Sequence, residues 1–163
     1  MSERDSLQYR PCVGVMLVNG EGRVFVGKRI DNKEGDRWQM PQGGVDEGED
    51  LDAAMLRELA EETGAKAEHL QIMARMAEEL FYDLPPELHG KLWGGRYKGQ
   101  RQSWYCVRFT GRDEDIDLDA WEHPEFCEFK WVDADLLPEL IVPFKREVYR
   151  SVVEAFREKL GPA

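Results

Sequence analysis

The chain has 163 residues, a net charge of −11 and a composition of 42% hydrophobic and 34% charged residues. That length lets one domain bury a core without disulfides, so we expect a single domain spanning residues 1–163. The composition excludes a disordered or fibrous protein. The negative charge argues against binding to DNA or to a membrane surface through bulk electrostatic attraction.

No apolar run approaches the ~18 to 20 residues of a membrane span, and the N-terminal sequence MSERDSLQYR lacks the apolar core of a secretory signal. We therefore expect a cytoplasmic protein. Three cysteines occur, at positions 12, 106 and 127, without CxxC spacing and in or beside apolar stretches. This pattern predicts buried free thiols rather than a disulfide framework or a zinc site.

The first half of the chain predicts a hairpin, a loop and a helix. Apolar runs at 13–18 and 24–26 flank the turn-forming sequence Asn19-Gly20-Glu21-Gly22, which is typical of a hairpin. The polar segment 31–37 is expected to be loop. Residues 50–63 carry helix formers without internal glycine or proline, and Gly64 follows where a glycine ends a helix.

The expected helix at 50–63 is amphipathic. At 100° per residue, Leu56, Leu59 and Ala60 fall on one side of it. Three glutamates, Glu58, Glu61 and Glu62, fall on the opposite side. We therefore expect a stripe of carboxylates facing away from the core.

The second half of the chain predicts mainly strands. Strand patterns occur at 70–76, 81–82, 102–109 and 126–132, and the strand tryptophans Trp104 and Trp131 are assigned to the core. Between them, Pro85-Pro86 opens an expected basic loop with glycines at 90, 94, 95 and 99. Residues 145–159 predict a closing helix with an apolar face.

Charge is distributed unevenly along the chain. Residues 43–64 contain eight acids and one base, whereas residues 87–108 contain five bases and one acid. Such segregation suggests a metal site beside an anion site. Two solvated faces of opposite sign are the alternative.

The three helix glutamates favour the metal site. Side chains four residues apart lie ~5 to 6 Å apart at Cβ, so Glu58 and Glu62 can share a hard cation, with Glu61 beside them. Their mutual repulsion costs a few tenths of a kcal/mol per pair, which a bound cation would offset. The glycines before the helix allow backbone atoms to approach the same ion or its phosphate ligand.

The spacing of the acidic segment resembles the Nudix box of Nudix hydrolases. The matching residues are Gly43, Glu49, Arg57-Glu58-Leu59, Glu61-Glu62 and Gly64, and the departure is Ala65, where the family usually has a larger aliphatic residue. From about Tyr9 to Phe156 the chain is similar to the bacterial RNA pyrophosphohydrolase branch, which includes dinucleoside polyphosphate hydrolases. The similar motifs are Tyr9-Arg10-Pro11, Trp38 to Gly44, Gly99 to Tyr105, Pro124-Glu125-Phe126 and Pro143 to Tyr149.

The resemblance implies an α+β protein with the Nudix fold, an α/β/α sandwich with a mixed central sheet. It also implies a metal site for Mg²⁺, for which Mn²⁺ or another divalent cation can substitute. Its ligands would be Glu58, Glu61, Glu62, Glu125 and the Gly43 carbonyl. Glu58 is the favoured general base, and Arg57 and Glu49 would complete the catalytic group by orienting the glutamates through charge-assisted hydrogen bonds.

Substrate contacts are assigned from position in the matched motifs. The cations Arg10, Arg29, Lys98, Arg101 and Lys145 would meet phosphates, although each is equally well a solvated surface residue. Phe144 would stack on a base, with a core role as the alternative. Tyr82 would line the same cleft.

The resemblance implies removal of pyrophosphate from 5′-triphosphorylated RNA, the step that starts mRNA decay. Asymmetric hydrolysis of dinucleoside polyphosphates such as Ap4A or Ap5A is the alternative substrate class. A binding module with an inactive site is disfavoured, because every glutamate of the box is present.

Overall fold

The computed structural model describes residues 8–31, 37–88, 90–91 and 95–161. Its strands form one eight-stranded sheet. They are β1 (Gln8–Val18), β2 (Val24–Arg29), β3 (Trp38–Gln39), β4 (Gln42–Gly44), β5 (Leu70–Arg75), β6 (Leu80–Asp83), β7 (Tyr97–Phe109) and β8 (Phe126–Val132). The α-helices of these residues are α1 (Leu51–Thr63), α2 (Leu137–Leu140) and α3 (Arg146–Phe156). Most of the expected loop at 31–37 lies outside the described residues.

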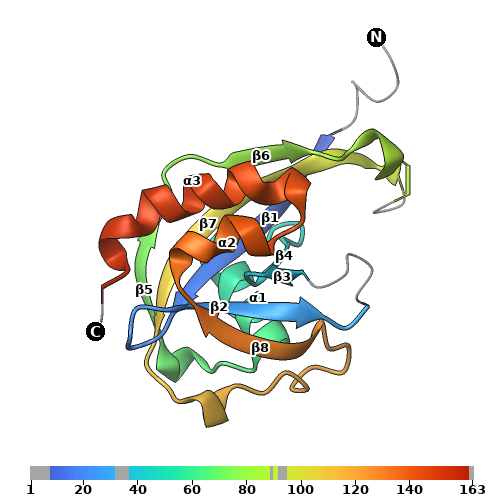
Figure 1. The fold of residues 1–163 in the computed structure, drawn as a ribbon. Helices are drawn as coiled ribbons and strands as arrows, with labels where there is room; N and C mark the ends of the chain where they lie inside the picture. Colours follow the sequence, from blue (N-terminus) through green and yellow to red (C-terminus); the bar gives the residue numbers. More distant parts are fainter. Residues whose placement is uncertain (1–7, 32–36, 89, 92–94, 162–163) are drawn as a thin grey trace.

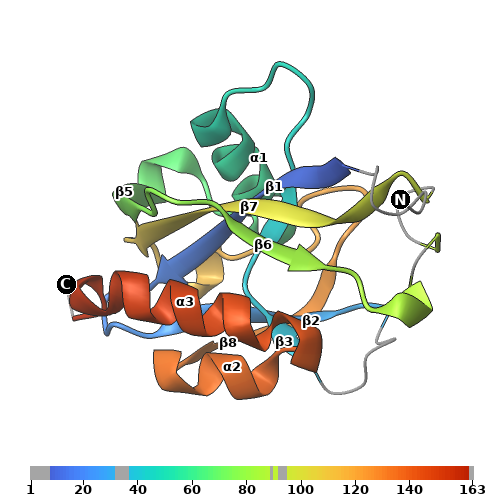
Figure 2. The same ribbon diagram turned by 90° about the horizontal axis from the view of Figure 1, so that it is seen from above.

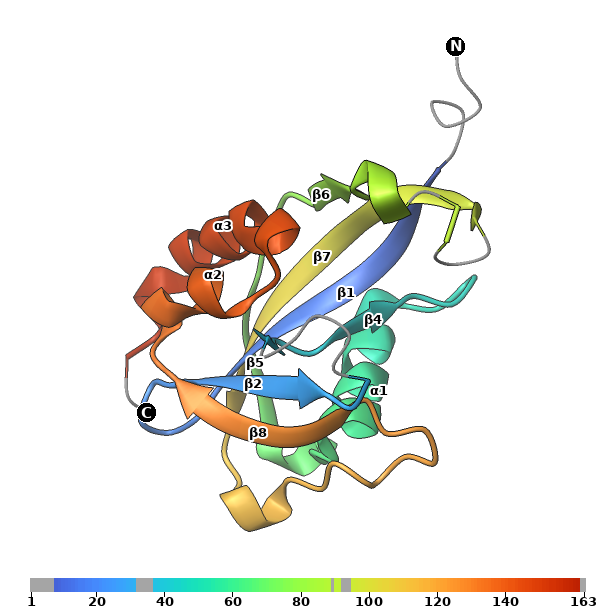
Figure 3. The same ribbon diagram turned by 45° about the vertical axis from the view of Figure 1, so that its right-hand side comes forward.

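The sheet is mixed, as predicted. Strands β1 and β7 pair in parallel at its centre, from Gln8↔Tyr97 to Val18↔Arg108, and the other pairs are antiparallel. β5 and β6 pair with the outer edge of β7, while β4 and β2 pair with β1. Figure 3 shows β1 and β7 as two long, twisted strands that lie side by side.

Helices cover both faces of the central strands, which confirms the predicted sandwich. Val13, Val15 and Leu17 of β1 pack in the cluster that includes α1, whereas Met16 and Val18 pack in the cluster that includes α3. A strand buried on both faces is apolar throughout rather than alternating. Figures 1 and 2 show α1 on one side of β1 and β7, and α2 and α3 on the other.

The predicted hairpin is confirmed, but the two strands pair only at Val18↔Val24. β4 occupies the same edge of β1 from Cys12 to Gly14, and the Val15 N–H donates to the Pro41 carbonyl. β2 therefore leaves β1 and pairs along its length with β8.

Several expected boundaries are corrected. β7 begins at Tyr97 rather than at residue 102, because β1 pairs with it from Gln8↔Tyr97 onward and β6 pairs with it from Asp83↔Gly99 onward. Gly99 therefore lies in a strand and not in the basic loop. Cys127 is exposed, not buried as expected of all three thiols.

Trp104 is buried as predicted, whereas Trp131 is half-buried and its indole donates to Asp113. The closing helix α3 ends at Phe156 and continues as a 3-10 turn, Arg157–Lys159. Within the described part of the chain, no helix is long and apolar enough to cross a membrane.

Candidate active site

Helix α1 has the boundaries that its sequence predicts. Asp50 caps its start, with its carboxylate accepting a hydrogen bond from the Ala53 N–H at 3.2 Å. Gly64 ends it in the left-handed conformation, φ 72°, and its N–H donates to the Ala60 carbonyl. The helix is therefore held at both ends by local contacts.

The face that α1 buries is the expected one only in part, since Leu59 is buried and Leu56 is half-buried. Its buried residues are Ala54, Met55, Glu58, Leu59, Glu62 and Thr63. Ala60, expected on the core side, is exposed. Glu58 and Glu62 face inward because the short strand β4 and the loop after it lie against that side of the helix, where Gln42 and Gly43 meet the two carboxyl groups.

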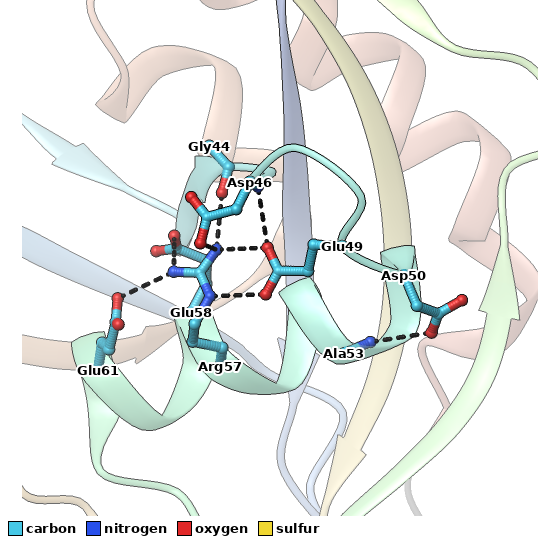
Figure 4. Close-up of polar contacts among 8 residues, drawn as sticks. All are labelled: Gly44, Asp46, Glu49, Asp50, Ala53, Arg57, Glu58 and Glu61. Atoms are coloured by element: carbon cyan, nitrogen blue, oxygen red, sulfur yellow. Dashed lines mark hydrogen bonds and ion pairs between the residues drawn. The ribbon is translucent and has the colours of Figure 1, made fainter.

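Arg57 connects the loop before α1 to the helix glutamates (Figure 4). Its guanidinium donates twice to Glu49, both at 2.8 Å, and to the Gly44 carbonyl at 2.9 Å. It also donates to Glu58 at 2.9 Å and to Glu61 at 3.3 Å. The hydrogen bonds from Arg57 lower the pKa of Glu49 to about 2. Arg57 and Glu49 thus lie where an orienting role requires them.

Glu58 and Glu62 are acidic groups in a buried environment. Burial, followed by the nearby charges of Glu61 and Glu125, raises the pKa of Glu58 to about 7 against the lowering effect of Arg57. Burial together with the charges of Glu58 and Glu125 raises the pKa of Glu62 well above its ordinary value. Its carboxylate accepts one hydrogen bond, from the Gln42 N–H at 3.0 Å.

Gly43 makes room for the Glu58 carboxyl group. A Cβ at position 43 would lie 2.1 Å from the Glu58 carboxyl carbon, so any side chain there would displace it. β4 pairs Gly43 with Val13 of β1, which fixes this glycine against the sheet. The Gly43 backbone and the Glu58 carboxyl group therefore lie close together.

The described residues contain no ready-made group of three metal-binding side chains. Figure 4 shows that Arg57 binds both Glu58 and Glu61. The donor set nevertheless fits a hard cation, since it consists of carboxylate oxygens with excess negative charge. Glu125 contributes to that excess from the residue just before β8.

Two aromatic rings, Tyr82 and Phe144, and the ammonium group of Lys145 lie together, although Tyr82 is far from the other two in the sequence. The two ring centroids lie 5.6 Å apart, and the Lys145 Nζ lies 5.7 Å from the Tyr82 ring and 5.6 Å from the Phe144 ring. Tyr82 is buried in β6, while Phe144 is half-buried. Lys145 also lines a small cleft with Gln39, Gln42, Gln102, Trp104, Val148 and Tyr149.

The remaining predicted cations are more scattered. The Arg10 guanidinium lies against Gly44, and the Lys98 Nζ lies 4.7 Å from the Tyr9 ring centroid. Arg29 forms an ion pair with Asp31 at 2.8 Å. Arg101 is exposed between two buried glutamines of β7 and binds Glu79 at 3.1 Å, which places it on the other face of the strand from the cleft.

A row of buried polar residues on β7 was not expected from the sequence. Gln100 and Gln102 lie beside Trp104 on one face, and their side chains hydrogen-bond to one another. The available signal was the two-residue spacing of amides within an otherwise apolar strand, since buried polar side chains require partners.

Comparison with known proteins gives a family and near-full-length relatives. The NUDIX domain matches residues 8–152. The chain is 64% identical over 152 residues to an RNA pyrophosphohydrolase of Novosphingobium aromaticivorans, covering 93% of this chain and 94% of that one. It is 58% identical over 156 residues to an RNA pyrophosphohydrolase of Erythrobacter litoralis, covering 96% and 95%.

Solved structures support the fold. The E. coli dihydroneopterin triphosphate pyrophosphohydrolase superposes with a TM-score of 0.69 at 23% identity, covering 91% of this chain and 99% of that one. A C. elegans Ap4A hydrolase binary complex superposes with a TM-score of 0.66 at 20% identity, covering 92% and 98%. At such identities the likeness concerns architecture alone.

Proposed function

Because the chain belongs to the Nudix family, we propose that it is a Mg²⁺-dependent hydrolase that removes pyrophosphate from the 5′-triphosphate end of RNA. The observation that carries the substrate assignment is the 64% identity to an RNA pyrophosphohydrolase over 93% of the chain. The geometry of α1 supports the chemistry, since buried carboxylates meet a glycine-lined strand there. Such an enzyme would begin mRNA decay, and we place it in the cytoplasm.

The proposed cation ligands are Glu58, Glu61, Glu62, Glu125 and the Gly43 carbonyl oxygen. When bound, Mg²⁺ or a substitute such as Mn²⁺ neutralises phosphate oxygens and lowers the pKa of a water molecule. Burial, followed by the charges of neighbouring carboxylates, raises the pKa values of Glu58 and Glu62, and this crowding of negative charge supports the assignment.

Glu58 is the proposed general base. Arg57 binds its Oε1 at 2.9 Å, which leaves Oε2 to accept a proton from the attacking water. A pKa near the working pH suits a base that must accept a proton and later release it. Arg57 and Glu49 act as positioning residues, because their paired hydrogen bonds fix the direction of the Glu58 carboxylate.

The residues around Lys145 are proposed to hold the RNA end. Phe144 stacks on the first base beside Tyr82, and Lys145 and Arg10 meet phosphate oxygens. The cluster of two rings and a lysine supports this division, since base stacking is worth ~1 to 3 kcal/mol. Lys98, Arg29 and Arg101 stay predictions as phosphate contacts, the last two being paired with carboxylates.

A direct competition tests the substrate. Triphosphorylated RNA and Ap4A are offered together under the same Mg²⁺, and their kcat/KM values are compared. We expect RNA to be preferred. A higher value for Ap4A would assign the chain to dinucleoside polyphosphates instead, and absence of any Mg²⁺-dependent release of phosphate or pyrophosphate would favour a binding module.

A further inference from the structure

Three buried residues of β7 form a hydrogen-bonded row. Gln100, Gln102 and Trp104 are 2%, 3% and 1% exposed, and their two-residue spacing places them on one face of the strand. The Trp104 indole N–H donates to the Gln102 Oε1 at 2.9 Å. The Gln102 Nε2 then donates to the Gln100 Oε1 at 2.7 Å and to the Gln42 Oε1 at 3.3 Å. The row thus reaches from β7 to Gln42 on β4.

The direction of these bonds is set by the tryptophan. An indole N–H can only donate, so the Gln102 atom that faces it must be the carbonyl oxygen. The Gln102 amide nitrogen, which carries two hydrogens, then supplies one to each neighbouring glutamine oxygen. The Gln42 oxygen is used in this way, and its amide NH₂ is left as the group that can bind elsewhere.

Gly14 allows the row to cross the sheet. Gly14 of β1 pairs with Gln42 of β4 on one side and with Trp104 of β7 on the other. A Cβ at position 14 would lie 2.5 Å from the Trp104 ring. The missing side chain therefore lets the indole lie over β1, between the two strands that carry the glutamines.

Gln42 lies between the acidic group and the cleft. Its backbone N–H donates to the Glu62 carboxylate at 3.0 Å. Its side chain lines the small cleft together with Gln102, Trp104 and Lys145. A phosphate chain that extends from the carboxylates toward Lys145 would pass this side chain.

We propose that Gln42 binds a phosphate oxygen of the substrate through its side-chain NH₂, and that Trp104 and Gln102 are positioning residues that fix this orientation. The site thereby accepts groups rich in hydrogen-bond acceptors and disfavours groups that donate. The inference rests on the proposed function, which supplies the polyphosphate.

The first test removes the donor. Gln42→Met keeps the size of the side chain and should raise the KM for triphosphorylated RNA by roughly 10-fold to 100-fold, the range for a lost hydrogen bond to a charged group. Gln71→Met on the exposed side of β5 is the matched control and should leave KM unchanged. An unaltered KM in Gln42→Met would overturn the proposal.

A double-mutant cycle separates positioning from general damage. Gln102→Met should raise KM in the wild-type background but have no further effect in the Gln42→Met background, because Gln102 acts through Gln42. Equal losses in both backgrounds would show that Gln102 acts independently and would contradict its assigned role.

A measurement on the unaltered protein covers the case in which a variant does not fold. Titration with inorganic pyrophosphate and Mg²⁺ should shift the NMR resonances of the Gln42 side-chain NH₂ and leave those of Gln71 in place. A stationary Gln42 signal would overturn the inference. If that signal shifts while the protein fails to cleave RNA, phosphate binding by Gln42 is supported and the proposed RNA substrate is wrong.

Discussion

The proposed site has an acidic side and an aromatic side, and the two are built differently. The acidic side, Glu49 to Glu62, comes from one continuous segment whose side chains are joined by hydrogen bonds to Arg57. The aromatic side joins Tyr82 to Phe144 and Lys145, which are far apart in the sequence, through packing of rings and a cation. The proposed catalytic group is therefore mostly local in the sequence, with Glu125 as its distant member, whereas the proposed base-recognition group joins two distant segments.

The two sides also differ in electrostatic balance. On the acidic side, burial and mutual repulsion raise the pKa values of Glu58 and Glu62. On the aromatic side, Lys145 lies close to two rings that attract a cation. The acidic side is therefore the side that gains most from a bound cation.

The largest expected effect comes from Glu58→Gln. An amide cannot accept the proton of the attacking water, so kcat should fall by about 10²- to 10⁴-fold. Turnover is measured at saturating Mg²⁺, with Glu68→Gln as an exposed control. Near-normal turnover in Glu58→Gln would move the general base to another residue.

Gly43→Ala should have the next largest effect. The added methyl group would lie 2.1 Å from the Glu58 carboxyl carbon and must displace it. A shift of about 1 Å at a catalytic group can cost roughly 10²-fold, which we expect in kcat. Gly20→Ala, with no atom within 4 Å of the new Cβ, is the control. Equal activity of the two variants would show that the Gly43–Glu58 approach is unimportant.

Phe144→Ala tests the aromatic side. Loss of a stacked base should lower kcat/KM for RNA by about 10-fold, from the ~1 to 3 kcal/mol of one stacking contact. Phe81→Ala removes an exposed ring of β6 that packs on Tyr9 and serves as the comparison. A similar loss in both variants would indicate damage to β6 rather than to base recognition.

The smallest effect concerns stability and pH without metal. The folded state raises the pKa of Glu58 from 4.5 to about 7, so it favours the protonated acid. The stabilising contribution of Glu58 is complete below pH 4.5 and disappears as the pH rises to about 7. With EDTA, the Tm should therefore be lower at pH 8 than at pH 5, by roughly 2 to 4 °C for each kcal/mol lost.

Mg²⁺ should reverse this trend, because cations bind the deprotonated carboxylates, and its addition should raise Tm more at pH 8 than at pH 5. Glu62→Gln should flatten the EDTA profile, since it removes a buried charge while its amide oxygen can still accept from the Gln42 N–H. Glu49 does not contribute, as its pKa of about 2 lies below this interval. If the Tm measured in EDTA did not change between pH 5 and pH 8, the electrostatic difference between the two sides would be contradicted.

Local patterns in the sequence predicted the local features of the fold. Helix α1 begins after Asp50 and ends at Gly64, because the cap residues act within one turn. The contact between Arg57 and Glu49 was expected because a guanidinium beside the helix glutamates can bind the acid of the preceding loop, and the structure shows this contact.

Contacts between distant segments were harder to predict. Helical periodicity placed Ala60 on the core side and the glutamates outside, but strand β4 lies beside the carboxylates and reverses that assignment for Glu58 and Glu62. The strand character of residues 97–101 depends on pairing with β1 and β6, which the local sequence around Gly99 does not indicate. The Gln42 link to Gln102 joins residues of two strands and has no signal within either one.

The parallel pairing of β1 with β7 has a consequence for synthesis of the chain. The paired residues are separated by about 90 positions, as in Val13↔Ser103. At about 5 to 20 residues per second, the ribosome needs roughly 5 to 18 s to make that intervening segment. During this time β1, which is apolar on both faces, has an unpaired edge because β7 has not been made. The nascent chain is therefore exposed to aggregation through that edge.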